Sequence, residues 1–222
     1  MKFRFTIGRK IGTGFGVIIF AIVIVFFVQI KNASNSIEVV DLSQELDDKI
    51  DDVYDPSLKL LKNLEEKLIL SKNYIEKWAN EESKSTEGWK VEVTEINEEV
   101  IPEIIKNLKG FRNQWPAKEV QILDTVIHDL DYLLTVYKEV RTILPDLASN
   151  DEDILTLSAQ DLVNPVSDAE RVYNSIQNNL NDLYTRQELR LKENKESLEA
   201  VRTRSKTATR FLFNLLIIAG VA

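Results

Sequence analysis

The stretch LKNLEEKLILSKNYIEKW, residues 61–78, decides the fold class, because its large apolar side chains recur every three or four positions. Leu61, Leu64, Leu68 and Trp78 follow this spacing, and most of the positions between them are polar. That period places the apolar side chains on one face of an α-helix, whereas a β-strand would alternate apolar and polar residues. The stretch therefore predicts an amphipathic helix packed along a narrow apolar seam.

The same period continues in both directions between Asn32 and Thr209 and marks four long helices. Breaker-rich segments separate these helices at residues 80–88, 113–116 and 145–153. Only 7 Gly and 5 Pro occur in the 222 residues. The sequence therefore predicts an all-α fold, an antiparallel up-down four-helix bundle with long outer helices. The seam positions, helix by helix, are Leu46, Ile50, Val53, Leu61, Leu64, Leu68, Ile75 and Trp78; Trp89, Val93, Ile96, Val100, Ile104, Leu108, Phe111 and Trp115; Val120, Leu123, Ile127, Leu130, Leu134, Tyr137, Val140 and Leu144; Val166, Ala169, Tyr173, Ile176, Leu180, Leu183, Leu191, Leu198 and Val201.

Three prolines fall within the predicted helices. Asp55-Pro56 and Asn164-Pro165 each resemble a helix N-cap followed by a proline in the first turn. They predict a break or a kink in the two outer helices. Pro102 predicts a bend in the second helix, because proline lacks the N–H that an interior helical position donates.

An uncharged apolar run extends from Ile11 to Ile30. At 1.5 Å per residue, about twenty residues span roughly 30 Å, the thickness of the hydrocarbon core of a bilayer. We therefore predict transmembrane helix 1 over residues 11–30. A cleaved signal peptide is the alternative, but its apolar core usually has about 7 to 15 residues and ends in small residues. The glycines of this run follow a basic segment and no strand, so they do not indicate a nucleotide-binding loop.

Charge is sorted along the chain, whose formal net charge is -8. Residues 1–10 hold basic side chains and no acidic one, and every Asp and Glu lies between Glu38 and Glu199. The positive-inside rule then predicts a cytoplasmic N-terminus at 1–10 and an extracytoplasmic domain at 31–209. Between Asn32 and Val201, 36 acidic side chains stand against 19 basic ones, a net charge of about -17. Such a surface argues against nucleic acid as a partner.

A second apolar run covers residues 211–222 at the C-terminal end of the sequence. Its twelve residues are too few to span a bilayer, so we interpret them as the start of a truncated transmembrane helix 2. An apolar segment that packs in the bundle is the alternative. One feature opposes this topology, since four basic residues between Arg202 and Arg210 would flank helix 2 on its outer side. The first helix usually dominates orientation, and the prediction follows it.

The outer helices are longer than the inner ones. The inner pair has about 30 residues each and the outer pair about 50, which correspond to roughly 45 and 75 Å. A bundle of the inner length ends near residues 50 and 184, and only two helices continue as a stalk. Because the seam turns polar at Gln187 and Asn194, we expect a second copy of the chain to complete the stalk as a homodimer. A loosely packed, mobile stalk is the alternative.

The sequence shows little that could support catalysis. It contains no cysteine and a single histidine, His128, with Asp124 and Asp131 on neighbouring helical faces. One His and two carboxylates favour a solvated acidic surface over a metal site. No nucleophile lies beside a base, so we expect no enzyme activity, no cofactor and no metal.

A sensor bundle would bind a small ligand in a gap between helices through a few polar groups. Arg141 lies beside the Tyr137 seam position of the third helix, and Arg171 lies beside Tyr173 in the fourth. These four residues are the candidate ligand-binding residues if the arginines point inward to receive a carboxylate. The alternative is that each arginine extends to the surface, because an unpaired buried guanidinium is costly. The three tryptophans near the turns are candidates for packing the bundle ends or for ligand stacking.

With an apolar run at each end and a helical bundle between, the chain resembles the N-terminal sensor region of bacterial methyl-accepting chemotaxis proteins with a four-helix-bundle ligand-binding domain. The resemblance rests on TIGRKIGTGFG (residues 6–16), on VYDPSLKLLKNL (residues 53–64) and on the apolar run after Arg210. It implies a multi-pass protein of the inner membrane that passes a ligand or stress signal to a cytoplasmic domain by helix displacement. The signal could come from a small molecule or a periplasmic protein.

The same module occurs in front of histidine kinases and cyclases, so the resemblance leaves the output domain open. A membrane-anchored helical scaffold or tether without a ligand is the alternative from a different functional class.

Overall fold

The computed structural model describes residues 15–16, 19–20, 23, 26–27, 38–80, 88–144 and 152–221. Helix accounts for 93% of these residues, and no strand occurs among them. The prediction of an all-α fold with four helices is confirmed.

The chain divides into two compact units. The bundle unit comprises Lys49–Glu193, and the terminal unit comprises Met1–Asp48 together with Asn194–Ala222. The bundle unit begins at Lys49, next to the predicted residue 50, and ends at Glu193, nine residues beyond the predicted residue 184.

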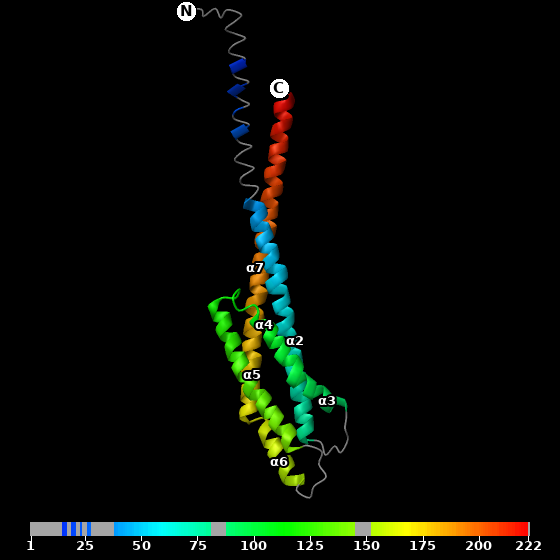
Figure 1. Ribbon diagram of the computed structural model, residues 1–222. Coiled ribbons are helices and arrows are strands. Elements are labelled where there is room, and N and C mark those ends of the chain that lie inside the picture. The colour runs from blue at the N-terminus through cyan, green and yellow to red at the C-terminus, as the bar shows by residue number, and fades with distance from the viewer. Residues whose placement is uncertain are drawn as a thin grey trace, which may run out of the picture. The chain divides into compact units, whose positions relative to one another are not determined.

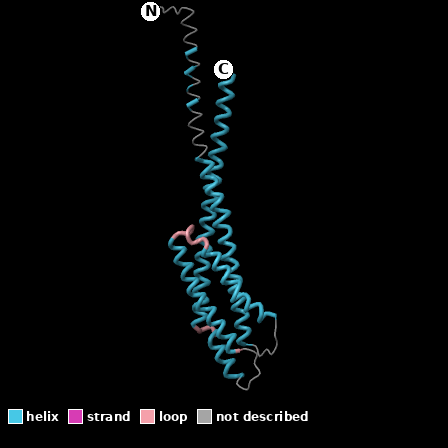
Figure 2. The backbone as a smooth tube through the Cα atoms, viewed as in Figure 1, coloured by secondary structure: helices cyan, strands magenta, loops and turns pink. Residues whose placement is uncertain are grey.

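In the described part of the bundle unit, helical segments form four successive columns (Figures 1 and 2). The first consists of η1 (Ile50–Tyr54) and α2 (Asp55–Asn80), and the second of α3 (Gly88–Glu95), η2 (Ile96–Val100) and α4 (Ile101–Lys109). The third is α5 (Ala117–Ile143). The fourth consists of α6 (Glu152–Val163) and the first half of α7 (Asp168–Val221). Figure 1 shows the chain reversing direction from each column to the next within this unit.

The core of the bundle unit lies between the columns. Four leucines have 0% of their surface exposed, as expected for seam positions of packed helices: Leu64, Leu68, Leu123 and Leu183. In α5 the buried face is wider than predicted, because Val126, Leu133 and Val136 are also buried. Predicted seam residue Val166 is 84% exposed, because it lies in the turn between α6 and α7 and not in a helix.

Two prolines lie inside continuous helical columns, and each follows a π-helical segment. Pro56 comes two residues after the end of η1, and Pro102 comes two residues after the end of η2. In both segments the N–H of the residue before the proline donates to the carbonyl five positions back, Asp55 to Ile50 and Ile101 to Ile96. The wider π turn accommodates a ring that would clash with the carbonyl four positions back in an α-helix. Of the two outcomes predicted at Pro56, a break or a kink, the break is absent, because the helical column continues through the proline.

The fourth column does break at Pro165, but Asn164 is not the N-cap of α7 as predicted. The Oδ1 atom of Asn164 accepts a bond from the N–H of Val166 at 2.9 Å and forms a turn. Ser167 is the cap, since its Oγ accepts from the N–H of Glu170 at 3.1 Å. This Ser-x-x-Glu spacing is that of a capping box.

In the terminal unit, residues 38–48 and 194–221 are helical. Leu198 is buried and Leu46 half-buried, and Arg202 donates to Asp47 at 2.7 Å. Predicted transmembrane helix 1 lies mainly outside the described residues. Of its residues, Phe15, Ile19, Phe20, Val23, Phe26 and Phe27 are helical and exposed. Within the described ranges, no helix combines the length and the apolar character that a membrane span requires.

Candidate functional site

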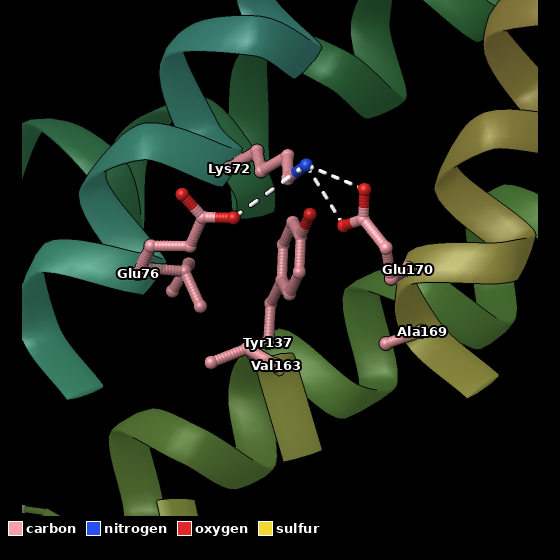
Figure 3. Close-up of a pocket in the computed structure, with 7 residues that line it drawn as sticks. Lys72, Glu76, Tyr137, Val163, Ala169 and Glu170 are labelled. Carbon is pink, nitrogen blue, oxygen red and sulfur yellow. Dashed lines mark hydrogen bonds and ion pairs between the residues drawn. The ribbon is translucent and has the colours of Figure 1, made fainter. Parts of the chain in front are cut away.

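The break between α6 and α7 leaves a hollow in the bundle unit, which we call the α6–α7 hollow (Figure 3). It has about 210 Å³ of empty space including its open mouth, and its enclosed part holds about one water-sized group. Its lining residues from the fourth column, Val163, Ala169 and Glu170, lie on either side of the break at residues 164–167. The lining residues come from α2, α5, α6 and α7 and are Lys72, Ile75, Glu76, Tyr137, Val163, Ala169 and Glu170.

An ion pair joins two columns at this hollow. The Nζ atom of Lys72 on α2 lies 2.8 Å from the carboxylate of Glu170 in the first turn of α7, and 3.5 Å from Oε1 of Glu76. Partial burial lowers the pKa of Lys72, but the hydrogen bond and charge of Glu170, with the charge of Glu76, raise it overall. Lys72 therefore remains a cation at neutral pH.

Two tyrosines complete the surroundings of the Lys72 ammonium. It lies 4.4 Å from the ring centroid of Tyr173, which is a cation–π distance. Tyr137 is 3% exposed, and Figure 3 shows its hydroxyl pointing into the space between Lys72, Glu76 and Glu170. Burial raises the pKa of both phenols, so both stay neutral at physiological pH.

The four predicted ligand-binding residues thus divide into two pairs. Tyr137 and Tyr173 meet around Lys72, at or beside the hollow. The two arginines do not line it.

Arg141 lies one turn beyond Tyr137 on α5, with a side chain that is 10% exposed. One of its terminal nitrogens donates to Glu98 of η2 at 2.9 Å, while its buried Nε has no hydrogen-bond partner. Arg171, in contrast, pairs with Asp168 one turn back on α7 and is 76% exposed. Arg141 therefore points inward, and Arg171 points to solvent.

Sequence reasoning missed Lys72, Glu76 and Glu170. Lys72 and Glu76 have the spacing of an exposed i,i+4 pair, which is common on solvated helix faces. The capping box of Ser167 and Glu170 was the available signal, since it marks a helix start four residues after Asn164.

The tryptophans pack at the ends of columns, as the structural alternative predicted. Trp78 and Trp89 contact edge to face at 5.7 Å between ring centroids, and Trp78 Nε1 donates to the carbonyl of Leu144 at 3.1 Å. Trp115 stacks on Phe111 at 6.4 Å in the turn before α5. These contacts join the ends of neighbouring columns.

Among the described residues, no group of three or more His, Asp or Glu side chains is arranged to hold a metal ion. His128 is exposed on α5. Comparison with protein-family models, with curated proteins and with solved structures found no match to this chain.

Proposed function

We propose that this chain is the extracytoplasmic sensor and membrane anchor of a bacterial transmembrane receptor of the chemoreceptor type. In this proposal residues 1–10 are cytoplasmic, residues 11–30 and the run starting at 211 cross the inner membrane, and the bundle lies outside. The chain acts as a homodimer, has no enzymatic activity and passes its signal to a cytoplasmic domain by displacement of α7.

One observation carries the proposal: α7 starts at the α6–α7 hollow and continues as a single helix into the second apolar run. Glu170 of its first turn binds Lys72, and the same helix extends to Val221. A helix without interruption transmits an axial shift or a rotation with little loss. Shifts of about 1–2 Å are the usual scale for helices in such transitions.

The Lys72–Glu170 pair provides the link between a ligand and helix position. It joins α2 to the N-terminal turn of α7 across 98 positions of sequence. A ligand that binds more tightly to one position of that turn shifts the population toward it. The energy available is limited to the difference in its affinity for the two positions.

Membrane topology is the direct test, and the absence of cysteine makes it simple, because every introduced thiol is unique. Lys118→Cys places a thiol on the exposed first turn of α5, and Lys2→Cys places one in the basic N-terminus. We expect a membrane-impermeant maleimide to label the first variant in intact cells and the second only after lysis. Labelling of both only after lysis, or recovery of the chain without membranes, would contradict the proposal.

Pairing of two copies and its response to stimuli separate the receptor from the tether. Val40 is 59% exposed in the terminal unit, so Val40→Cys should form disulfide-linked dimers under mild oxidation. A sensor requires the rate of this cross-linking to change with the stimulus. A rate that is the same under every stimulus would favour the tether.

A further inference from the structure

The Tyr137 hydroxyl is one of several polar groups of the bundle unit that lack a hydrogen-bond partner among the described residues. The residue is 3% exposed, and no described residue forms a hydrogen bond with its hydroxyl. Figure 3 shows this hydroxyl directed into the α6–α7 hollow. Buried polar groups without a protein partner are rare and usually bind water or a ligand. The hydroxyl is therefore available to a water molecule or a ligand that enters the hollow.

The charges of the residues that line the hollow favour a cationic ligand. Glu76 and Glu170 carry two negative charges, and Lys72 supplies one positive charge. Lys72 lies closer to Glu170, at 2.8 Å, than to Glu76, at 3.5 Å, so the Glu76 carboxylate is the less neutralised of the two. Because Glu76 is 40% exposed, a ligand can reach it from solvent. A second positive charge beside Glu76 would balance the site.

The size of the hollow selects a primary ammonium among cations. The enclosed part admits one water-sized group, which matches an –NH₃⁺ head but not a quaternary ammonium. The head has three N–H donors, and the carboxylate of Glu76 and the hydroxyl oxygen of Tyr137 are acceptors. An alkyl tail would leave through the open mouth, past Ile75 and Val163.

We propose that the α6–α7 hollow binds the ammonium head of a primary alkylamine, held by Glu76 and Tyr137. The bound ammonium pairs with Glu76, and Lys72 then pairs with Glu170 alone. The two cations and the two carboxylates therefore alternate in the site. The signalling consequence of this assignment rests on the sensor role proposed above. Ligand binding would strengthen the Lys72–Glu170 contact, which joins the first turn of α7 to α2.

Binding is measured on the full purified chain by titration calorimetry with methylammonium chloride at constant ionic strength. Tetramethylammonium has the same charge without N–H donors, and sodium acetate is an anion of similar size, so both serve as controls. We expect saturable binding of methylammonium and none of either control. Equal heats for methylammonium and tetramethylammonium would overturn the assignment, because they would indicate non-specific charge attraction.

Four variants locate the site. Tyr137→Phe should weaken methylammonium binding about five- to tenfold, through loss of one buried hydrogen bond. Glu76→Gln should weaken it by about tenfold or more, through loss of a charge-assisted bond. Tyr132→Phe on the exposed face of α5 and Glu66→Gln on the exposed face of α2 are matched controls and should bind as the parent does. Unchanged affinity in both Tyr137→Phe and Glu76→Gln would overturn the proposal.

Folding and topology are checked separately. Circular dichroism verifies each variant, and if Tyr137→Phe does not fold, the half-exposed Glu76→Gln decides alone. The calorimetric result does not depend on membrane orientation. Methylammonium binding together with contrary cysteine labelling would therefore overturn the receptor and keep the site, whereas correct labelling without binding would overturn the site alone.

Discussion

Gln187 and Glu119, 68 positions apart in the chain, meet in the core of the bundle unit, where Nε2 of Gln187 donates to Oε2 of Glu119 at 2.7 Å. Gln187 is 0% exposed and Glu119 is 2% exposed. Arg190, one turn further along α7, donates to the other carboxylate oxygen at 2.8 Å. Gln187 is one of the two polar seam positions from which we expected a second copy of the chain to complete the stalk. Its side chain is hydrogen-bonded to Glu119 of the same chain.

Replacing Glu119 by alanine should lower the free energy of unfolding by about 2–3 kcal/mol, because the buried amide of Gln187 and the half-buried guanidinium of Arg190 would both lose their acceptor. Urea denaturation followed by circular dichroism measures the change. Glu139→Ala on the exposed face of α5 is the matched control and should change the free energy by less than about 0.5 kcal/mol. Equal effects of the two substitutions would show that the buried cluster does not hold α5 and α7 together.

The Ser71–Asn97 pair should be replaceable by apolar residues. Ser71 Oγ lies 2.5 Å from Asn97 Oδ1, while the buried Nδ2 of Asn97 has no partner. Ser71→Ala alone should lower the free energy of unfolding by about 1 kcal/mol, because it leaves both ends of the amide unpaired. Ser71→Ala with Asn97→Leu should recover this loss, since the unpaired amide is removed with its partner. A double-mutant cycle in urea measures the coupling, and a double variant less stable than either single variant would contradict this account.

Alkaline pH should lower the free energy of unfolding of the bundle unit, and its buried tyrosines should contribute more to this loss than its exposed tyrosines do. Burial raises the pKa of Tyr137 and Tyr173 above the ordinary value of 10.0, and Glu170 and Glu76 contribute to a raised pKa of Lys72. Above about pH 10 the folded chain thus binds more protons at these groups than the unfolded chain does. The free energy of unfolding therefore falls as pH rises, by about 1.4 kcal/mol per pH unit for each proton of difference.

The pH prediction is tested by urea denaturation between pH 8 and 11.5. Tyr137→Phe should flatten the decline above pH 10, because its phenol no longer titrates. Tyr132→Phe, an exposed tyrosine on the same helix, should leave the slope unchanged. An identical slope in the parent and in Tyr137→Phe would refute the assigned role of burial.

The Ser167 cap should contribute measurably to the position of α7. Ser167→Ala removes the acceptor of the Glu170 N–H and should lower the free energy of unfolding by about 1 kcal/mol. Ser167→Asp keeps a capping oxygen at the same place and should retain most of the stability. Thermal denaturation of the two variants compares them, and an equal loss in both would mean that the hydroxyl does not cap the helix.

The helices were largely predictable because their signals are local. The third helix was expected between Val120 and Leu144, and α5 occupies Ala117–Ile143. The turn before it was expected at 113–116 and extends over residues 110–116. The π segments before Pro56 and Pro102 were not expected, because proline alone does not reveal whether a helix breaks or widens around it.

The candidate site was predictable only in part. Tyr137 and Tyr173 belong to the apolar seams, so the periodicity directed both toward the interior. The two charged partners at the centre, Lys72 and Glu170, occupy positions that the same periodicity assigns to solvent. Glu170 lies in the first turn of α7, directly after the break at residues 164–167, and the apolar period does not show which element that turn contacts.

By itself, the sequence determined the helical class, the four columns and the approximate places of their turns, because a period of 3.6 residues and the breakers between periodic segments are properties of neighbouring residues. Only the tertiary structure decided that Glu119 meets Gln187 and Arg190, that Arg141 points inward while Arg171 does not, and that a hollow opens beside Tyr137. These contacts depend on the rotation and axial register of one helix against another. A repeating apolar seam permits several such registers, and the packing of the whole core selects one of them.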